Sequence, residues 1–310
     1  MRAQAIFPIL GVGLTLLMLS RAAWADGLFM PSTRLSRNDR EAIQQQVARY
    51  KTLDPVSFQR LETLQGHRPQ VYRQFRSQQP SVLAELQSLG PGAGWALLEA
   101  VSFRAPERGE ATQREWDAVR EGIIIALGER EMPEASPVFR AIFTHENSDW
   151  IALRGAAIGL GRLGGESEKT LLINALQRKG QRRDAALWGL RYVRDLRAVD
   201  AVVPWLMDSS EPTAKLAARA LGYMGSSWAW RTGRAGKKEY EMPIRGKCAE
   251  ALLDAFSRRG EALREPIARS LSMVEHPDTL SRVEQVIDSL TNEQERRAWL
   301  RLKQRLQASR

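Results

Sequence analysis

Three glycines in the middle of the chain have the spacing of a nucleotide-binding loop. Gly159, Gly161 and Gly164 fit the pattern G-x-G-x-x-G, and Lys169 and Thr170 follow them like the end of a phosphate loop. In such loops, backbone N–H groups and the start of a helix hold a phosphate or pyrophosphate. A dinucleotide fingerprint requires a strand just before its glycines, and a phosphate loop requires a glycine just before its lysine.

The residues around these glycines meet neither requirement. The preceding segment, DWIALRGAAI at residues 149–158, has apolar residues at helical spacing, and Glu168 occupies the position before the lysine. A similar segment, AARALGYMG, recurs at residues 217–225. We therefore expect the glycines to permit close helix packing and to end a helix, because glycine tolerates the left-handed conformation found there.

Residues that commonly carry catalysis or bind metals are few and scattered. The three histidines are His67, His145 and His276, and none has a second histidine at the spacing of a zinc-protease helix. Cys248 is the single cysteine, so the chain can form neither an internal disulfide nor a site built from cysteine pairs. We expect Cys248 to be buried in a helix. The sequence predicts no catalytic residue, no metal, no cofactor and no enzymatic activity.

The composition predicts helices as the elements that position every candidate residue. The 310 residues are 43% hydrophobic and 26% charged, as in ordinary folded proteins. Alanine, leucine, arginine, glutamate and glutamine greatly outnumber valine, isoleucine and threonine. An all-α fold is expected.

A repeated helical hairpin organises most of the chain. Each unit consists of an alanine-rich helix, a short break and a second amphipathic helix, and the units align on one leucine each. These anchor leucines are separated by 33, 30, 31 and 50 residues, and are Leu127, Leu160, Leu190, Leu221 and Leu271. A fainter copy lies at residues 83–101. Since one hairpin leaves a face unburied, the units must stack, which predicts an α-solenoid of about five to six repeats.

Two further features recur with the leucines. Glycine follows the anchor leucine in three units, and a basic residue precedes it by six or seven positions in all five. The basic residues are Arg120, Arg154, Arg183, Lys215 and Arg264. This pattern resembles HEAT repeats, especially the short type related to phycobilin-lyase repeats. Arg191 and Ser272 replace the glycine in the other two units.

The resemblance implies a right-handed α-solenoid that binds other macromolecules as a scaffold or adaptor. Some proteins with similar repeats act on bilin chromophores, so the alternative function is an enzyme whose active site is assembled across repeats. Only the repeat skeleton matches, and no catalytic group of those enzymes can be placed on this chain. Fold analogy alone says little about activity.

The N-terminus has the pattern of a signal peptide at residues 1–25. Arg2 precedes the uncharged apolar segment 6–19, and Ala23 and Ala25 fit the small-residue rule for cleavage before Asp26. The apolar segment is shorter than the roughly 20 residues that a membrane-spanning helix needs. We expect an exported protein, periplasmic or extracellular, with no transmembrane span in its mature chain.

The rest of the chain divides into three parts. Residues 26–80 are expected to form an N-terminal helical segment and linker, with helices near 39–51 and 56–65. Residues 81–290 form the solenoid. Residues 291–310 form a capping helix, which Thr291 would begin in capping-box spacing.

Positive charge is the feature that most suggests a partner. The formal net charge is +10, or +8 without Arg2 and Arg21 of the signal peptide. The long fourth interval contains an insertion at about 226–245, rich in basic and aromatic residues. We predict that it protrudes as a loop and contributes a binding site, whose candidate residues are Trp228, Trp230, Arg231, Arg234, Lys237, Lys238 and Tyr240.

Two interpretations of this insertion stay open. It can contact a partner, or its tryptophans can pack back onto the solenoid while its lysines only aid solubility. A protein partner is favoured, and anionic lipid or a cell-wall polymer would also suit the charge. Nucleic acid is disfavoured because the protein is expected outside the cytoplasm.

Overall fold

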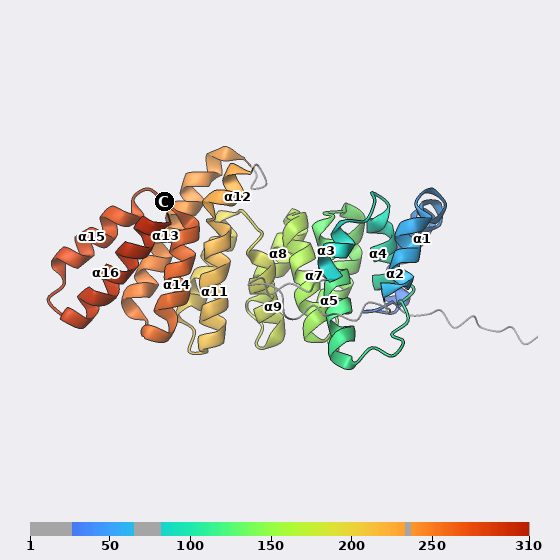
Figure 1. Cartoon of the computed structure of the whole chain (residues 1–310), viewed down its shortest axis with the longest axis horizontal. Helices are drawn as coiled ribbons and strands as arrows, with labels where there is room; N and C mark the ends of the chain where they lie inside the picture. The colour runs from blue at the N-terminus through green and yellow to red at the C-terminus, as the bar shows by residue number, and fades with distance from the viewer. Residues whose placement is uncertain (1–26, 65–81, 233–236, 310) are drawn as a thin grey trace, which may run out of the picture.

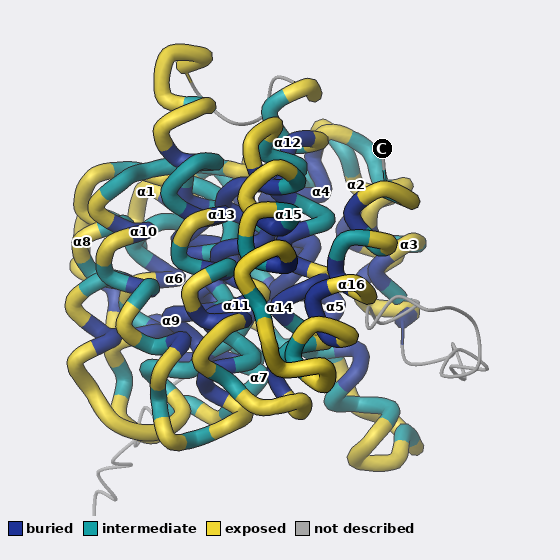
Figure 2. The backbone as a smooth tube through the Cα atoms, turned by 90° about the vertical axis from the view of Figure 1, so that its left-hand side faces the viewer, coloured by how far each residue is buried: buried dark blue, intermediate teal, exposed yellow. Residues whose placement is uncertain are grey.

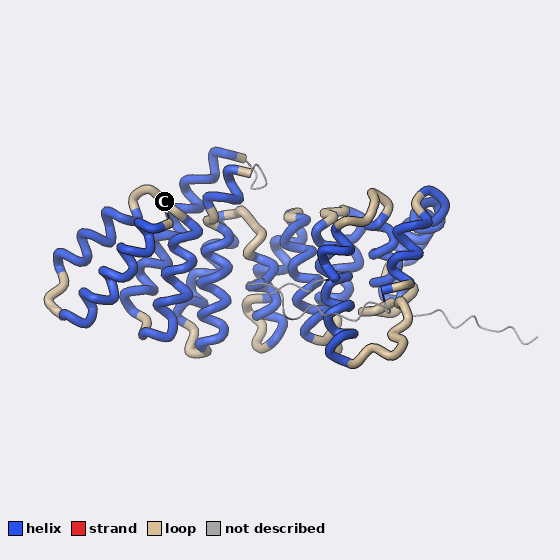
Figure 3. Tube along the Cα trace, viewed as in Figure 1, coloured by secondary structure: helices blue, strands red, loops and turns tan. Residues whose placement is uncertain are grey.

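The computed structural model describes residues 27–64, 82–232 and 237–309. The predicted signal peptide at 1–25, His67 and Arg234 lie outside these ranges. Within them the chain is helical and contains no strand (Figure 3). The predicted all-α class is confirmed.

The helices follow one another along an elongated stack (Figure 1). The N-terminal helices are α1 (Arg37–Leu53), α2 (Pro55–Glu62), α3 (Val82–Gln87) and α4 (Ala93–Ser102). The repeat helices are α5 (Gln113–Glu129), α6 (Ser136–Thr144), α7 (Trp150–Leu163), α8 (Glu166–Ala175), α9 (Gln181–Leu190), α10 (Leu196–Val202), α11 (Glu211–Met224), α13 (Glu241–Arg258), α14 (Glu261–Val274) and α15 (Thr279–Ser289). Two further helices are α12 (Ser227–Arg231) and α16 (Glu293–Ala308).

The repeat helices form two layers. One layer stacks α5, α7, α9, α11 and α14 in direct contact, each on the next. The partner helices α6, α8, α10, α13 and α15 each follow one of them in sequence. The result is the α-solenoid that the repeat pattern predicts.

The anchor leucines lie at the centre of this stack. All five are fully buried, from Leu127 in α5 to Leu271 in α14. They belong to one hydrophobic cluster that runs through the described repeats. Figure 2 shows buried residues gathered between the helices and exposed residues on the outside. Each repeat is therefore stabilised by its neighbours, as expected for a solenoid.

The glycines of the G-x-G-x-x-G segment serve this stacking. A Cβ on Gly161 would lie 2.0 Å from the carbonyl oxygen of Gly189 in the next repeat, and a Cβ on Gly159 would meet the Phe139 ring at 2.5 Å. Gly164 ends α7 with φ +62°. The prediction of close packing and helix ending is confirmed, and these residues form no phosphate loop.

Most of the recurring basic residues join neighbouring repeats. The contacts to the following repeat or helix are Arg120 to Asp149 at 2.5 Å, Arg183 to Thr213 at 2.9 Å and Arg264 to Glu295 at 2.6 Å. Arg154 pairs with Glu121 of the preceding repeat. Lys215 pairs with Glu211 inside its own helix. The basic position is thus mainly structural.

Helices close both ends of the described stack. α1 and α2 pack on α4, and α4 packs on α5. At the other end α16 packs on α14 and α15, and Trp299 meets the Phe256 ring edge-on at 5.0 Å. The N-cap of α16 is Asn292, because its side chain accepts hydrogen bonds from Gln294 and Glu295. The predicted start at Thr291 was one residue early.

The insertion is more helical than predicted. A short helix, α12, begins at Ser227, and α13 starts at Glu241 instead of near Lys247. Pro243 lies in the first turn of α13, where a missing N–H costs no helical hydrogen bond. Gly246 lies inside the helix, where a Cβ would approach the His276 ring at 3.3 Å. The prediction of a loop was therefore wrong for residues 227–231 and 241–245.

Candidate functional site

One position of the repeat lines a large groove. The residues two places after the anchor leucines all face a groove of about 1230 Å³, and they are Glu129, Arg162, Tyr192, Tyr223 and Met273. They lie at or just beyond the C-terminal ends of α5, α7, α9, α11 and α14. Because these helices stack side by side, equivalent positions form a row. The groove is thus a property of the repeat.

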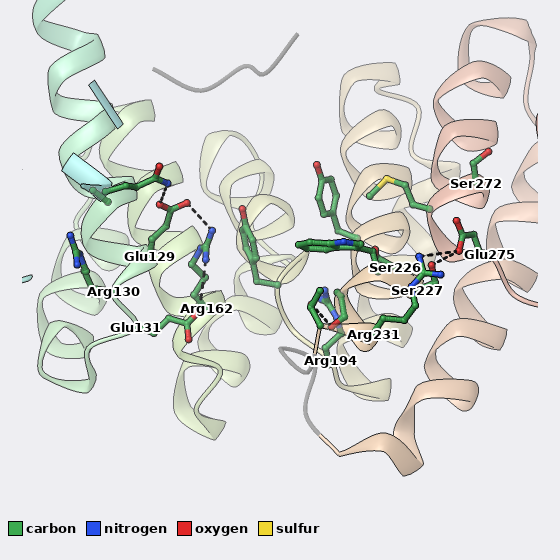
Figure 4. Close-up of a pocket in the computed structure, with 18 residues that line it drawn as sticks. Glu129, Arg130, Glu131, Arg162, Arg194, Ser226, Ser227, Arg231, Ser272 and Glu275 are labelled. Carbon is green, nitrogen blue, oxygen red and sulfur yellow. Dashed lines mark hydrogen bonds and ion pairs between the residues drawn. The ribbon is translucent and has the colours of Figure 1, made fainter. Parts of the chain in front are cut away.

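The insertion supplies the wall beside this row. Ser226, Ser227, Trp228, Arg231 and Thr232 line the groove together with Glu275 at the end of α14. Figure 4 shows the lining from Glu129 and Arg130 at one end to Ser272 and Glu275 at the other.

Two arginines at the ends of the groove have carboxylate partners, while Arg130 donates to the backbone carbonyls of Leu86 and Leu89. Arg162 lies 3.0 Å from Glu129 and 3.8 Å from Glu131. At the other end Arg231 lies 3.7 Å from Glu275. Each end therefore largely neutralises its own charge.

Both ends also contain a glutamate in the left-handed conformation. Glu131 has φ +52° and Glu275 has φ +48°, a region that residues other than glycine seldom adopt. Glu275 ends α14 in this way, as Gly164 ends α7. The Ser227 hydroxyl donates a 2.5 Å hydrogen bond to Glu275, and Arg245 donates to the Glu275 carbonyl at 2.6 Å. These bonds hold the carboxylate at the groove wall.

Arginines and aromatic rings alternate along the middle of the stack. The Arg191 guanidinium lies 3.8 Å from the Tyr223 ring centroid, 4.9 Å from that of Trp188 and 5.1 Å from that of Tyr192. Arg162 lies 4.5 Å from the Tyr192 centroid. Cation–π contacts of this kind fix the rings and guanidinium groups in place. The contacts therefore preorganise Arg162, Tyr192 and Tyr223, which line the groove.

Two arginines in the middle lack the ion pairs found at the ends. In the described part of the chain, neither Arg191 nor Arg194 pairs with a carboxylate. The Nε atom of each, like that of Arg162, is buried without a hydrogen-bond partner. Arg194 donates from Nη1 to the Arg191 carbonyl at 2.8 Å. Burial, together with the nearby Arg191 charge, lowers the pKa of Arg194 to about 10. Arg194 still carries its charge at neutral pH.

The seven candidate residues of the insertion differ in where their side chains lie. Trp228 is 61% exposed and lines the groove with Arg231. Trp230 packs against the hydrophobic core. The side chains of Lys237, Lys238 and Tyr240 are exposed and do not line the groove. Trp230 therefore packs back onto the solenoid, as the second interpretation expects, while Trp228 does not. Arg234 is outside the described residues.

The sequence analysis identified Trp228 and Arg231 but missed Arg162, Tyr192, Arg194 and Tyr223 of the groove. In the sequence, one groove-lining residue of each repeat occupies the second position after the anchor leucine. That position varies in chemical type from glutamate to methionine, so it gives no motif. Only the stacking of the helix ends shows that Tyr192 and Tyr223 share one surface.

The cysteine and the two histidines in the described ranges do not come together in a site. Cys248 is fully buried, and burial raises the pKa of its thiol to about 12. His145 ends α6, and His276 lies in the turn between α14 and α15. Among the described residues no group of three metal-ligating side chains comes together. None of the helices in the described ranges has the length and apolarity needed to cross a membrane.

Comparisons with known proteins support the repeat assignment for part of the chain. Residues 106–191 match a family model described as HEAT repeats. A search of curated proteins found no match. A solved structure of human deoxyhypusine hydroxylase in complex with glycerol aligns with 73% of this chain and 88% of its own, at 16% identity and a TM-score of 0.29. That likeness is too slight to carry an argument. The family match and the stacked hairpins together support HEAT repeats at residues 106–191, within an α-solenoid.

Proposed function

We propose that this protein is an exported, non-enzymatic scaffold or adaptor that binds a protein partner in the groove along its repeat helix ends. The observation that carries the proposal is the row of residues two places after the anchor leucines. It gives five consecutive repeats a single lining with Tyr192 and Tyr223 near its middle. Tyrosine, tryptophan and arginine are the residues that most often anchor protein interfaces.

The exposure of Trp228 supports the same surface. A tryptophan that is 61% exposed at the groove wall leaves a large apolar side chain in water. Covering it would bury apolar area between two proteins, which favours association. Trp230, two residues away, is instead packed on the core. This difference in exposure supports a role for Trp228 in binding and not in stabilising the fold.

Export is proposed from residues 1–25 of the sequence alone. The positive start, apolar segment and small residues at Ala23 and Ala25 support a cleaved signal peptide. We also place the repeats with the short type related to phycobilin lyases, on their leucine-glycine pattern, without extending the activity of those enzymes to this chain.

A pull-down from the exported fraction tests the proposal. Trp228→Ala and Tyr223→Ala proteins should capture the partner at least about tenfold less well than the unmodified protein, because each removes an aromatic anchor. Leu300→Ala is the matched control, since Leu300 is 39% exposed on α16 and outside the groove.

The control should bind normally, and circular dichroism should show that all variants are folded. Equal capture by the groove variants and the control would contradict a role for the groove. Turnover of a substrate in an activity screen, abolished by the groove variants, would favour the enzymatic alternative.

A further inference from the structure

The middle of the groove contains positive charge that the protein does not neutralise. Arg162 and Arg231 at its ends pair with groove glutamates. Arg194 lines the groove between them, and within the described ranges it makes no ion pair. Arg191, beside it, is held by aromatic rings and has no carboxylate partner there either.

This arrangement is costly unless a ligand compensates it. Burying a guanidinium without a counter-ion sacrifices hydration and gains no ion pair. The buried Nε atoms of Arg191 and Arg194 also lack hydrogen-bond partners. Their charges repel each other, which contributes to the lowered pKa of Arg194. An anionic group placed against Arg194 would offset these unfavourable terms.

The rest of the lining limits what kind of anion can enter. Glu129, Glu131 and Glu275 offset the arginines at the two ends of the groove. An evenly charged polymer such as a nucleic acid or a polyanionic glycan would therefore find surplus positive charge only in the middle. Tyr223 and Trp228 offer apolar contact area near the uncompensated arginines. The lining suits a ligand with isolated carboxylates between apolar or aromatic groups.

We infer that the groove binds a short acidic peptide segment of a partner protein, with an aspartate or glutamate carboxylate seated on Arg194 and neighbouring apolar side chains against Tyr223 and Trp228. The inference rests on the proposed function and specifies the chemistry of its partner. A carboxylate can accept charge-assisted hydrogen bonds from a guanidinium, which are stronger than neutral ones.

Selection from a phage-displayed library of random peptides tests this chemistry directly, since it does not require the natural partner. Peptides enriched on the unmodified protein should contain an aspartate or glutamate flanked by apolar residues. The same library is selected in parallel on Arg194→Gln protein, where enrichment of acidic residues should disappear. A selected peptide is then synthesised with its acid and with the matching amide.

Binding constants of these two peptides provide the quantitative test. The acidic peptide should bind Arg194→Gln protein roughly ten- to a hundredfold more weakly than it binds the unmodified protein. The amide peptide should bind the unmodified protein more weakly than the acidic peptide does, by a similar factor. Arg194→Lys should restore part of the affinity because it keeps the charge. Arg49→Gln, at an exposed position of α1 outside the groove, is the matched control and should bind normally.

Thermal unfolding separates this role from a structural one. Since Arg194 is a partly buried charge without a counter-ion in the described chain, Arg194→Gln should unfold at the same temperature as the unmodified protein or higher. A marked drop in unfolding temperature would show that Arg194 stabilises the fold and would overturn the inference.

The outcomes distinguish the inference from the proposed function. Selected peptides that lack acids but depend on Trp228 would overturn the acidic partner and leave the groove as a protein-binding surface. Peptides that bind equally well after both Arg194→Gln and Trp228→Ala would contradict both. Binding of a single-stranded oligonucleotide or of anionic vesicles, lost in Arg194→Gln while no peptide is enriched, would overturn the peptide in favour of that ligand.

Discussion

Single residue positions in this protein have separate duties fixed by their place in the repeat. The anchor leucine is buried, the next residue allows close approach of helices, and the one after that faces the groove. Gly161 and Arg162 show the last two duties side by side. In the following repeat Arg191 replaces the glycine and stacks on Tyr223 of the next helix. The loss of the leucine-glycine step therefore coincides with the middle of the candidate site.

Replacing Gly161 tests the packing duty. In Gly161→Ser the new Cβ would lie 2.0 Å from the Gly189 carbonyl oxygen, so the two helices must separate. We expect the free energy of unfolding to fall by about 1–3 kcal/mol, the usual cost of overpacking. Chemical denaturation monitored by circular dichroism measures this change.

Gly260 provides the control. Nothing lies within 4 Å of a Cβ at Gly260, the N-cap of α14. Serine is a favourable N-cap, so Gly260→Ser should leave stability unchanged or raise it slightly. Equal effects of the two substitutions would contradict the close approach of α7 and α9.

Sequence patterns predicted some helices of this protein correctly and others not. The repeated spacing of the anchor leucines was enough to place α5, α7 and α11, although α5 and α7 are buried on every side near their C-terminal ends. In the insertion, the glycines indicated a loop, but Gly246 lies inside α13, where it allows His276 to approach. A glycine required for contact and one required for a turn look alike in sequence.

The second layer of helices is joined by an ionic network that can be tested by pH. Asp195 caps α10, lies 2.8 Å from Arg197 and 3.1 Å from Lys169 of α8. Hydrogen bonds from Arg197 and then Lys169 hold the pKa of Asp195 below its ordinary value of 3.8. Its contribution to stability is therefore present above pH 3.8 and is lost as the pH falls through the folded-state pKa.

Asp195→Asn should remove this contribution while retaining a side-chain oxygen for the N-cap. We expect urea denaturation at pH 7 to show a loss of about 1–3 kcal/mol, typical of hydrogen bonds to charged groups. The difference from the unmodified protein should narrow below pH 3.8. Asp254→Asn, in an exposed pair with Arg258, should change stability little at either pH. A difference that stays constant with pH would contradict the ionic origin.

At the scale of the whole molecule, the sequence could predict the stack of hairpins but not the groove. The 33-, 30- and 31-residue intervals predicted a stack of hairpins, since each hairpin needs a neighbour to bury its second face. The groove depends instead on how far each helix extends and how neighbouring ends align. Tyr192 and Tyr223 are 31 residues apart in sequence, and only the stack brings both to one surface. Of the candidate residues in the insertion, Trp228 and Arg231 line this surface.

Site-specific photo-crosslinking in intact cells tests most directly whether this surface binds a partner. Benzoylphenylalanine placed at Trp228 should give a discrete crosslinked protein adduct, because this exposed position lines the groove. The same probe at Leu300, on α16 outside the groove, should give none. Arg194→Gln combined with the Trp228 probe should weaken the adduct. An adduct from Leu300 alone, or no adduct from Trp228, would contradict the proposal that the groove is the binding surface.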